Sequence, residues 1–494
     1  MSAFTQRLRP LAAWLVGPSS SRRQQVACGV MWLAAGDGLG AILGFVKLAI
    51  IARLLAPADF GLFAIALLTT GWLEYLTDLS FRDALIRHQD DVAPYIDTVW
   101  TAQILRGAVI ASIIAGSAPL VAGYYDVPLA MAAMPLLAIE VMVRAVANPA
   151  TVYLRKNLDL RRDILWRLAG PIAGLIAGVA LAVLLRNALA LFVSVLVASV
   201  AQTIASYWIR PYRPRLSFDS GHARELIGFG QRCFWLRLIG LLNWYVDTLV
   251  VSKVLGLTVT GQYQMAGRLA TAPGSTIGGP IHGVMFPAFS GLASLEHHRD
   301  ALRRTLAVVL SVALPLALGV TIFSPLIVGV LLGPGWAEVP ALLSVLAWLT
   351  VTLPASHVLN ALFMALDRIE LDIWANATRA AILVSLMYPA VTSQGALGAA
   401  AVTTASAVVG LLCQVVLAAR LVGLRPTALL PCLRGGLLAS LPLILVWIGG
   451  GSGVSAGGIT AAVSVGTVSA VIGLSSAWRI FATNSPVRPL EGVK

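Results

Sequence analysis

Charged side chains are scarce in this sequence. Only 12% of its 494 residues are Asp, Glu, Lys or Arg, about half the share that is usual in soluble globular domains. Hydrophobic residues make up 58% of the chain, against roughly 45 to 50% in such domains. A soluble fold of this length has no need for so much apolar surface. The composition therefore excludes a soluble protein and leaves no room for a separate soluble catalytic module.

Cysteine is also rare, with four residues in the chain. They lie singly in or beside apolar stretches, without the CxxC or Cys-His spacing that is typical of metal and redox sites. The pattern Gly36-x-Gly38-x-x-Ala41 matches the loose dinucleotide fingerprint, but no strand precedes it and it lies inside an apolar stretch. We therefore expect no disulfide, no metal site and no cofactor.

Apolar stretches fill most of the chain, and the gaps between them alternate in charge. Of the 35 lysines and arginines, 24 lie in every second gap, whereas the intervening gaps hold only Arg53, Arg186 and Lys253. This alternation follows the positive-inside rule, by which basic loops stay in the cytoplasm. It predicts an all-α integral membrane protein with fourteen transmembrane helices and both termini in the cytoplasm. The formal charge of +13 then reflects topology, so we expect no nucleic-acid partner.

The predicted helices divide into two bundles. A spanning helix needs about 20 apolar residues, and fourteen of them with short loops account for the length of the chain. We predict spans at 27–49, 60–80, 98–122, 129–152, 164–185, 188–209, 226–252, 262–290, 305–332, 337–365, 373–393, 396–419, 428–449 and 458–482. The domains are then a cytoplasmic N-terminal tail (1–26), a six-helix bundle (27–209), a cytoplasmic linker (210–225), a second six-helix bundle (226–419), and two extra transmembrane helices with a cytoplasmic tail (420–494).

An internal repeat at an offset of 200 residues supports the two bundles. The turn at 52–61, between the first two spans, matches the turn at 252–261, between the seventh and eighth, and Gly61 aligns with Gly261. Both turns lie on the same side of the membrane, so we expect parallel repeats related by an axis along the membrane normal. Small-residue spacing predicts close helix packing at Gly36, Gly40 and Gly44 and at Gly170, Gly174 and Gly178.

Eight basic and five acidic residues remain inside or near the predicted spans. Because a charge at the centre of a membrane helix costs about 2.5 to 3.5 kcal/mol, most of them must pair or face a polar cavity. Glu140 and Arg144, four residues apart, can pair on one helix face. Arg167 and Arg232, near cytoplasmic helix ends, are expected only to reach toward the interface. The surplus of basic groups predicts a net positive cavity and an anionic cargo such as pyrophosphate, which arginine binds in bidentate fashion.

Local motifs occur in the first two helices of each predicted half. They are Ala52-Arg53-Leu54-Leu55-Ala56-Pro57-Ala58-Asp59-Phe60-Gly61-Leu62, Asp78-Leu79 followed by Ala84-Leu85-Ile86-Arg87, Gly261-x-Tyr263-x-x-Ala266, and Val284-x-Phe286-Pro287-Ala288-Phe289-Ser290. In these motifs and in its topology, the chain resembles bacterial O-antigen and exopolysaccharide flippases, the polysaccharide transport family of the multidrug/oligosaccharidyl-lipid/polysaccharide (MOP) superfamily.

The resemblance implies a MATE-like pair of six-helix bundles that enclose a central cavity. It also implies a cargo of undecaprenyl-pyrophosphate-linked oligosaccharide repeat units. This cargo would be moved across the bacterial inner membrane, from the cytoplasmic to the periplasmic leaflet, for exopolysaccharide, capsule or lipopolysaccharide synthesis. Besides this substrate and membrane lipid, a polysaccharide polymerase and chain-length or export proteins are the candidate partners.

We expect transport by alternating access through a cationic cavity, with no enzymatic activity and no catalytic residue. The candidates to bind the head group are Lys47, Arg106, Arg144, Arg237, Arg268 and Arg379. Asp37 and Asp247 lie on the first helix of each half, and they are candidates for ion coupling or for holding the arginines.

Other functions fit parts of the sequence. A MATE-type drug or cation antiporter shares the fold, but its cavity is expected to have the opposite charge. A lipid II flippase of cell-wall synthesis shares both the fold and the cargo chemistry. A membrane polysaccharide polymerase fits the composition alone and would need a long periplasmic loop with catalytic residues, which the predicted topology lacks. A purely structural role explains the helices but not the intramembrane arginines.

Overall fold

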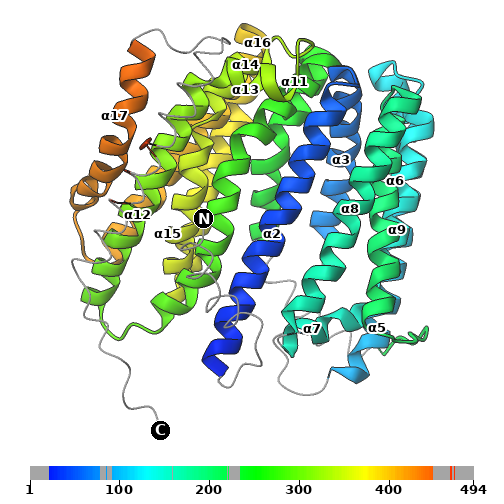
Figure 1. Cartoon of the computed structure of the whole chain (residues 1–494), viewed down its shortest axis with the longest axis horizontal. Helices are drawn as coiled ribbons and strands as arrows, with labels where there is room; N and C mark the ends of the chain where they lie inside the picture. Colours follow the sequence, from blue (N-terminus) through cyan, green and yellow to red (C-terminus); the bar gives the residue numbers. More distant parts are fainter. Residues whose placement is uncertain are drawn as a thin grey trace, which may run out of the picture. The chain divides into compact units, whose positions relative to one another are not determined.

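Helices make up almost all of the described chain. The computed structural model describes residues 22–77, 85, 92–157, 159–219, 221, 234–448, 468, 469, 472 and 475, and no strand occurs among them (Figure 1). A helix suits so apolar a chain because it satisfies every backbone N–H and C=O group within the segment, where no water is available. Nine of the described helices are long and apolar enough to cross a membrane, or ten if one bent pair is a single span.

The chain divides into two compact units, residues 1–54 with 69–234 and residues 55–68 with 235–494. Helix α3 (Pro57–Thr77) therefore begins in the second unit and ends in the first. The first unit also contains α2 (Arg22–Ala52), α5 (Ala93–Tyr125), α6 (Ala130–Ala145), η1 (Pro149–Thr151), α7 (Val152–Lys156), α8 (Leu160–Leu185) and α9 (Leu189–Ile209).

Glycines bring α8 and α9 close together in the first unit. A Cβ atom on Gly174 would lie 3.0 Å from the Cβ of Ala198, and one on Gly178 would lie 2.8 Å from the Oγ of Ser194. Such approach is possible only without a side chain on α8, and close van der Waals packing is what holds helices together in lipid. The packing predicted from the glycine spacing of α8 is confirmed.

Three predicted spans are interrupted. The span predicted at 129–152 ends as a helix at Ala145, and the chain then bends by 59° into η1 and α7. Asn148 causes the new start, because its side chain accepts a hydrogen bond from Ala150 N at 2.9 Å, and Pro149 fits the first helical position. The span at 305–332 divides at Phe323, and the span at 337–365 divides at Ala347 and Trp348.

Two very long helices of the second unit each contain a sharp break. In α11 (Phe234–Ser290) the break is at Gly256, with φ 79° and ψ −177°, and in α16 (Ile369–Leu421) it is at Gly395, with φ 62° and ψ −144°. A positive φ of this kind is readily adopted only by glycine. Each part is long enough to span a membrane separately. The other elements are α12 (Leu295–Ile322), α13 (Ser324–Leu331), α14 (Val339–Leu346), α15 (Leu349–Ala365), η2 (Pro426–Leu433) and α17 (Arg434–Ile448).

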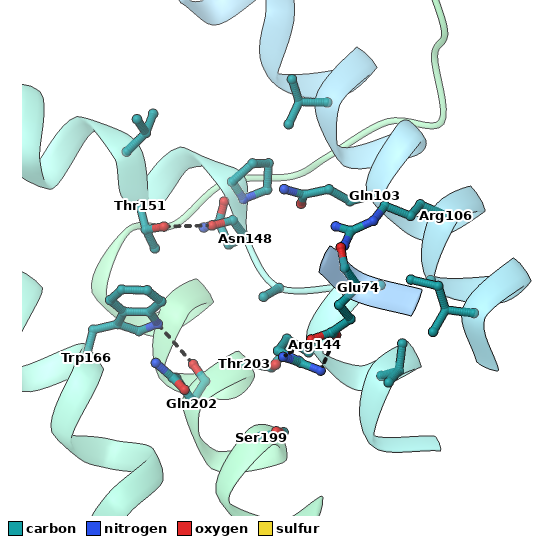
Figure 2. Close-up of a pocket in the computed structure, with 18 of the residues that line it drawn as sticks. Glu74, Gln103, Arg106, Arg144, Asn148, Thr151, Trp166, Ser199, Gln202 and Thr203 are labelled. Carbon is teal, nitrogen blue, oxygen red and sulfur yellow. Dashed lines mark hydrogen bonds and ion pairs between the residues drawn. The ribbon is translucent and has the colours of Figure 1, made fainter. Parts of the chain in front are cut away.

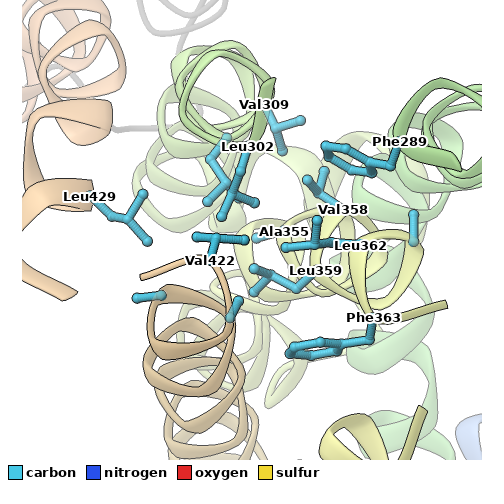
Figure 3. Close-up of a cluster of buried hydrophobic side chains, with 14 of the residues drawn as sticks. Phe289, Leu302, Val309, Ala355, Val358, Leu359, Leu362, Phe363, Val422 and Leu429 are labelled. Atoms are coloured by element: carbon cyan, nitrogen blue, oxygen red, sulfur yellow. The ribbon is translucent and has the colours of Figure 1, made fainter. Parts of the chain in front are cut away.

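A large buried apolar cluster of the second unit lies between α11, α12, α15, the end of α16 and η2 (Figure 3). Phe289, Leu302, Leu362 and Phe363 are each fully buried there. Val422 follows the last turn of α16 and packs into the same cluster. These side chains join helices that are far apart in sequence, and they hold α11, α12, α15 and α16 together within the second unit.

Two glycines of the predicted repeat meet at one helix crossing in the second unit. A Cβ on Gly61 of α3 would lie 2.0 Å from the carbonyl oxygen of Leu257, and a Cβ on Gly261 of α11 would lie 1.8 Å from that of Pro57. The two contacts are equivalent at the offset of 200 residues: residue 61 meets residue 257, and residue 261 meets residue 57. The crossing therefore has local two-fold pseudosymmetry, as expected where parallel repeats meet.

Candidate functional site

The first unit contains a polar cavity of about 380 Å³ among α3, α5, α6, α8 and α9. Two predicted binding residues, Arg106 and Arg144, line it together. Amide and hydroxyl groups and one indole complete the polar lining: Gln103, Asn148, Thr151, Trp166, Ser199, Gln202 and Thr203 (Figure 2). Side chains of these types can donate and accept hydrogen bonds toward a hydroxyl-rich ligand.

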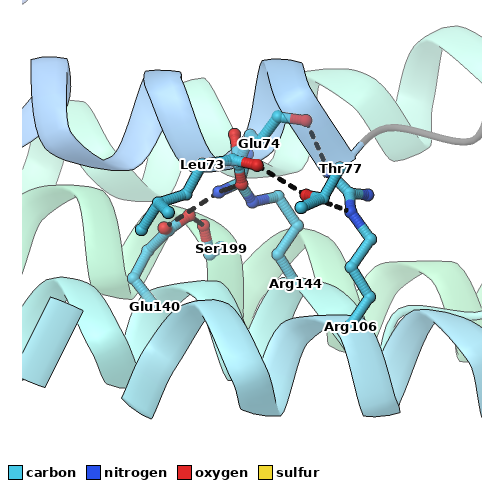
Figure 4. A network of polar contacts seen from close by, with 7 residues as sticks. All are labelled: Leu73, Glu74, Thr77, Arg106, Glu140, Arg144 and Ser199. Carbon is cyan, nitrogen blue, oxygen red and sulfur yellow. Dashed lines mark hydrogen bonds and ion pairs between the residues drawn. The ribbon is translucent and has the colours of Figure 1, made fainter. Parts of the chain in front are cut away.

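Arg144 is held between two carboxylates in this cavity (Figure 4). Its Nη2 and Nη1 donate to the two oxygens of Glu74, at 2.5 and 3.3 Å, and Nη2 also donates to Glu140 Oε2 at 3.2 Å. Ser199 donates to the other oxygen of Glu140 at 2.6 Å. The predicted pair of Glu140 and Arg144 is confirmed. The bidentate contact with Glu74 is the one that arginine also makes with phosphate.

Arg106 reaches the same helix end. Its Nε donates to Thr77 Oγ1 at 2.9 Å and its Nη2 to the carbonyl oxygen of Glu74 at 3.0 Å (Figure 4). Among the described residues of this network, two arginines face the two carboxylates of Glu74 and Glu140. Glu74 and Glu140 therefore balance the charge of Arg106 and Arg144 in this cavity.

The other predicted residues of the first unit lie elsewhere. Lys47 of α2 donates to Ser194 Oγ at 3.3 Å. Asp37 forms an ion pair with Arg167, and both line a second cavity of about 350 Å³. Arg167 also lies 4.0 Å from the fully buried Asp163. Two carboxylates of the first unit therefore lie beside it, and its expected reach toward the interface stays a prediction.

The second unit brings together three predicted residues in a pocket of about 160 Å³. Asp247, Arg268 and Arg379 come from α11 and α16 and line it with Asn243, Tyr263, Gln264 and Thr403. The hydroxyl of Tyr263 donates to Asp247 Oδ2 at 2.9 Å, and Thr248 N donates to Asp247 Oδ1 at 2.6 Å. The carboxylate is thus fixed on both oxygens.

The two arginines of this pocket are held less tightly. The guanidinium carbon of Arg268 lies 6.0 Å from the centre of the Phe63 ring, a cation–π distance. The Nε of Arg379 is buried and has no hydrogen-bond partner within the described part of the chain. Two arginines therefore face one carboxylate, and the described lining is net positive.

One predicted binding residue has a side chain that the structure does not describe. Several residues that line the two pockets were not predicted from the sequence. The side chain of Arg237 lies outside the described residues. Glu74 was recognised only as an intramembrane acid, because its partner Arg144 is 70 positions away and no helical spacing reveals the pair. Tyr263 and Thr403 bond each other at 2.9 Å and carry no charge; Tyr263 was noted only as part of a family motif, and Thr403 gave no signal beyond its place in an apolar helix.

The fold is that of MOP superfamily membrane proteins. The chain superposes on the lipid II flippase MurJ in its inward closed conformation with a TM-score of 0.70 and 14% identity, over 91% of this chain and 97% of MurJ. It superposes on an inward-facing multidrug resistance MATE family transporter of the MOP superfamily with a TM-score of 0.60 and 15% identity, over 79% of this chain and 95% of that one. The chain is therefore a multi-pass membrane protein of this fold class.

The chain belongs to the polysaccharide biosynthesis protein family, whose model matches residues 50–341. It is 24% identical to the succinoglycan biosynthesis transport protein ExoT of Rhizobium meliloti (strain 1021), over 62% of each chain. It is 23% identical to the lipopolysaccharide biosynthesis protein WzxC of Escherichia coli (strain K12), over 76% of this chain and 77% of that one. The family resemblance found in the sequence motifs is confirmed.

Proposed function

We propose that the protein is a flippase that moves undecaprenyl-pyrophosphate-linked oligosaccharide repeat units from the cytoplasmic to the periplasmic leaflet of the bacterial inner membrane. Its family and its relatives in succinoglycan and lipopolysaccharide biosynthesis support this cargo. The observation that carries the proposal is the pocket of the second unit, where Arg268 and Arg379 face one carboxylate. A positive surplus inside an apolar bundle is costly, and an anionic head group would offset that cost.

The topology in this proposal has fourteen spans, cytoplasmic termini and two parallel bundles at 27–209 and 226–419. The breaks at Gly256 and Gly395 support the larger span count, since they divide α11 and α16 into helical segments that are each long enough to be a span. The reciprocal contacts of Gly61 and Gly261 support the repeat. Alternating access follows from such repeats when one bundle moves against the other.

In the first unit, Glu74 occupies the place that a substrate anion would take. A phosphate or an acidic sugar that binds Arg144 in bidentate fashion must displace Glu74, while Glu140 and Ser199 keep the guanidinium in position. The amides and hydroxyls around it are suited to sugar hydroxyl groups. Binding of the head group would therefore change the partner of Glu74 on α3, which gives the substrate a direct effect on a helix contact.

In the second unit, the pyrophosphate would bind Arg379 and Arg268. Tyr263 and Thr248 fix both oxygens of Asp247 in this pocket. In the first unit, Asp37 holds Arg167 through an ion pair. Of the two roles predicted for these carboxylates, this ion pair favours holding an arginine for Asp37, and both roles stay predictions for Asp247. Lys47, with its bond to Ser194, is a weaker candidate than the arginines.

The test combines deletion with complementation. Loss of the gene is expected to abolish secreted polysaccharide and to trap lipid-linked repeat units at the cytoplasmic leaflet. Arg268→Ala and Arg379→Ala are expected to fail to restore export at normal membrane levels, whereas Arg161→Ala, at an exposed site outside both pockets, restores it. Export by both pocket variants at the wild-type rate contradicts the assignment of this pocket.

The same experiment separates the other functions. Repeat units that reach the periplasm without being polymerised would indicate a polymerase or ligase. Arrest of growth with accumulation of cell-wall precursor would indicate a lipid II flippase. Restored efflux of cationic dyes in cells that lack their own pumps would indicate a drug antiporter. The proposed polymerase and chain-length partners are tested by crosslinking in the wild type.

A further inference from the structure

The residues after α9 form an extended segment along the start of α5, which we call the strap (residues 210–219). Alternate backbone N–H groups of the strap donate to α5 side chains: Arg215 to Asp97 at 3.0 Å, Ser217 to Thr101 at 3.1 Å and Asp219 to Thr98 at 3.3 Å. N–H groups two residues apart point the same way when a chain is extended. The strap therefore packs against the first turns of α5 with these N–H groups toward the helix.

Side-chain contacts fix the beginning of the strap as well. Tyr212 donates its hydroxyl to Asp97 at 2.7 Å, and Asn148 donates to the carbonyl oxygen of Arg210 at 2.7 Å. The guanidinium of Arg210 lies 5.2 Å from the centre of the Tyr153 ring. Burial and the hydrogen bond to Asp97 raise the pKa of Tyr212, so it remains a donor at neutral pH. The strap is an ordered part of the first unit.

Two different edges result from the extended conformation, because successive side chains point to opposite sides. The even positions carry the ring or aliphatic groups of Tyr212, Pro214, Leu216 and Phe218, and the odd positions carry the polar groups of Arg213, Arg215, Ser217 and Asp219. Leu216 and Phe218 are 75% and 57% exposed, and both arginines are exposed. The strap thus presents an apolar edge and a basic edge, both fixed by its backbone.

We infer that the strap binds anionic phospholipid at the membrane surface. It starts at the end of α9, which is long and apolar enough to span, so it lies where head groups are found. Leu216 and Phe218 would enter the acyl boundary, and Arg213 and Arg215 would contact lipid phosphates. A loop that served topology alone needs basic residues. Such a loop needs neither a fixed backbone nor exposed leucine and phenylalanine side chains. The strap has both features, and they are the reason for assigning a lipid partner.

Native mass spectrometry of the purified full-length protein tests the inference, with phosphatidylglycerol and phosphatidylcholine as probes. The wild type is expected to retain phosphatidylglycerol in preference. Arg213→Gln with Arg215→Gln is expected to lower that affinity by about 30-fold, from the usual contribution of a basic residue near an anionic surface. Leu216→Ser with Phe218→Ser is expected to lower it as well. Arg161→Gln with Arg162→Gln, an equal change of charge at exposed sites, is the control and should have little effect.

Asp97→Ala distinguishes a built site from general attraction. It keeps every arginine and removes a negative charge, but it takes away two hydrogen bonds of the strap. Lower phosphatidylglycerol affinity in this variant supports the inference, whereas unchanged or higher affinity contradicts it. Equal losses in the arginine variant and in the control also contradict it. So does displacement of the lipid by glycerol phosphate at matched ionic strength, which would indicate a site for free phosphate.

Discussion

Alanine substitution at the glycine crossing of the second unit has a predictable structural cost. New Cβ atoms at Gly61 and Gly261 would lie 2.0 and 1.8 Å from backbone carbonyl oxygens, whereas such contacts are essentially never shorter than 3.0 Å. The opposing atoms are backbone, so no rotamer change relieves the overlap. Helices α3 and α11 must move apart by about 1 Å, a displacement of the kind that overpacked cores resist.

Overpacking of this kind typically costs about 1 to 3 kcal/mol, and the severity of both contacts places Gly61→Ala and Gly261→Ala near the upper end. For a unit of this size, a loss of about 3 kcal/mol lowers the melting temperature by roughly 6 to 12 °C. Gly267→Ala is the control, because it lies on the same helix and no atom lies within 4 Å of its added Cβ. It should be neutral or slightly stabilising, as alanine favours the helix.

Thermal unfolding of the purified protein in detergent, followed by a thiol-reactive dye or by circular dichroism, provides the measurement. The double variant adds a sharper criterion. Once one alanine has separated the helices, the second costs less, so the two effects should sum to less than their independent values. If Gly61→Ala and Gly261→Ala unfold at the same temperature as Gly267→Ala, or if their costs are fully additive, the close reciprocal crossing is refuted.

Other predictions concern single polar groups. Asn148→Ala removes three hydrogen bonds of a buried side chain, so we expect a loss of about 2 to 4 kcal/mol in thermal unfolding. Ser199→Ala leaves one oxygen of Glu140 short of a donor and should cost about 1 to 2 kcal/mol, without loss of membrane insertion. Because burial and Asp97 raise the pKa of Tyr212, its stabilising bond should be fully present below about pH 10 and lost as the pH rises further. Ultraviolet titration of the wild type against Tyr212→Phe measures this, and titration at the ordinary tyrosine value would contradict it.

The sequence predicted the class of fold and the family. Apolar stretches of spanning length, separated by gaps of alternating charge, allow little besides helices in a membrane, because only helices satisfy the backbone there without closing a barrel. The repeat was visible as well, since Gly61 and Gly261 occur at corresponding places. The positions at which helices break were harder to predict from the sequence. Asn148 gives a strong local signal for a helix start, but a hydrophobic run such as 337–365 does not show where it divides.

Tertiary structure decided which charges are partners. Glu140 and Arg144 were paired in advance because they lie four residues apart on one helix. Glu74 with Arg144, and Asp37 with Arg167, are separated by 70 and 130 positions, and only the tertiary fold of the first unit, including the packing of α2 on α8, brings them together. It leaves the cavity of the first unit electrically balanced, whereas the pocket formed by α11 and α16 in the second unit is positive. Composition determines how many charges the membrane domain carries, but the position of each helix determines which of them remain available to a substrate.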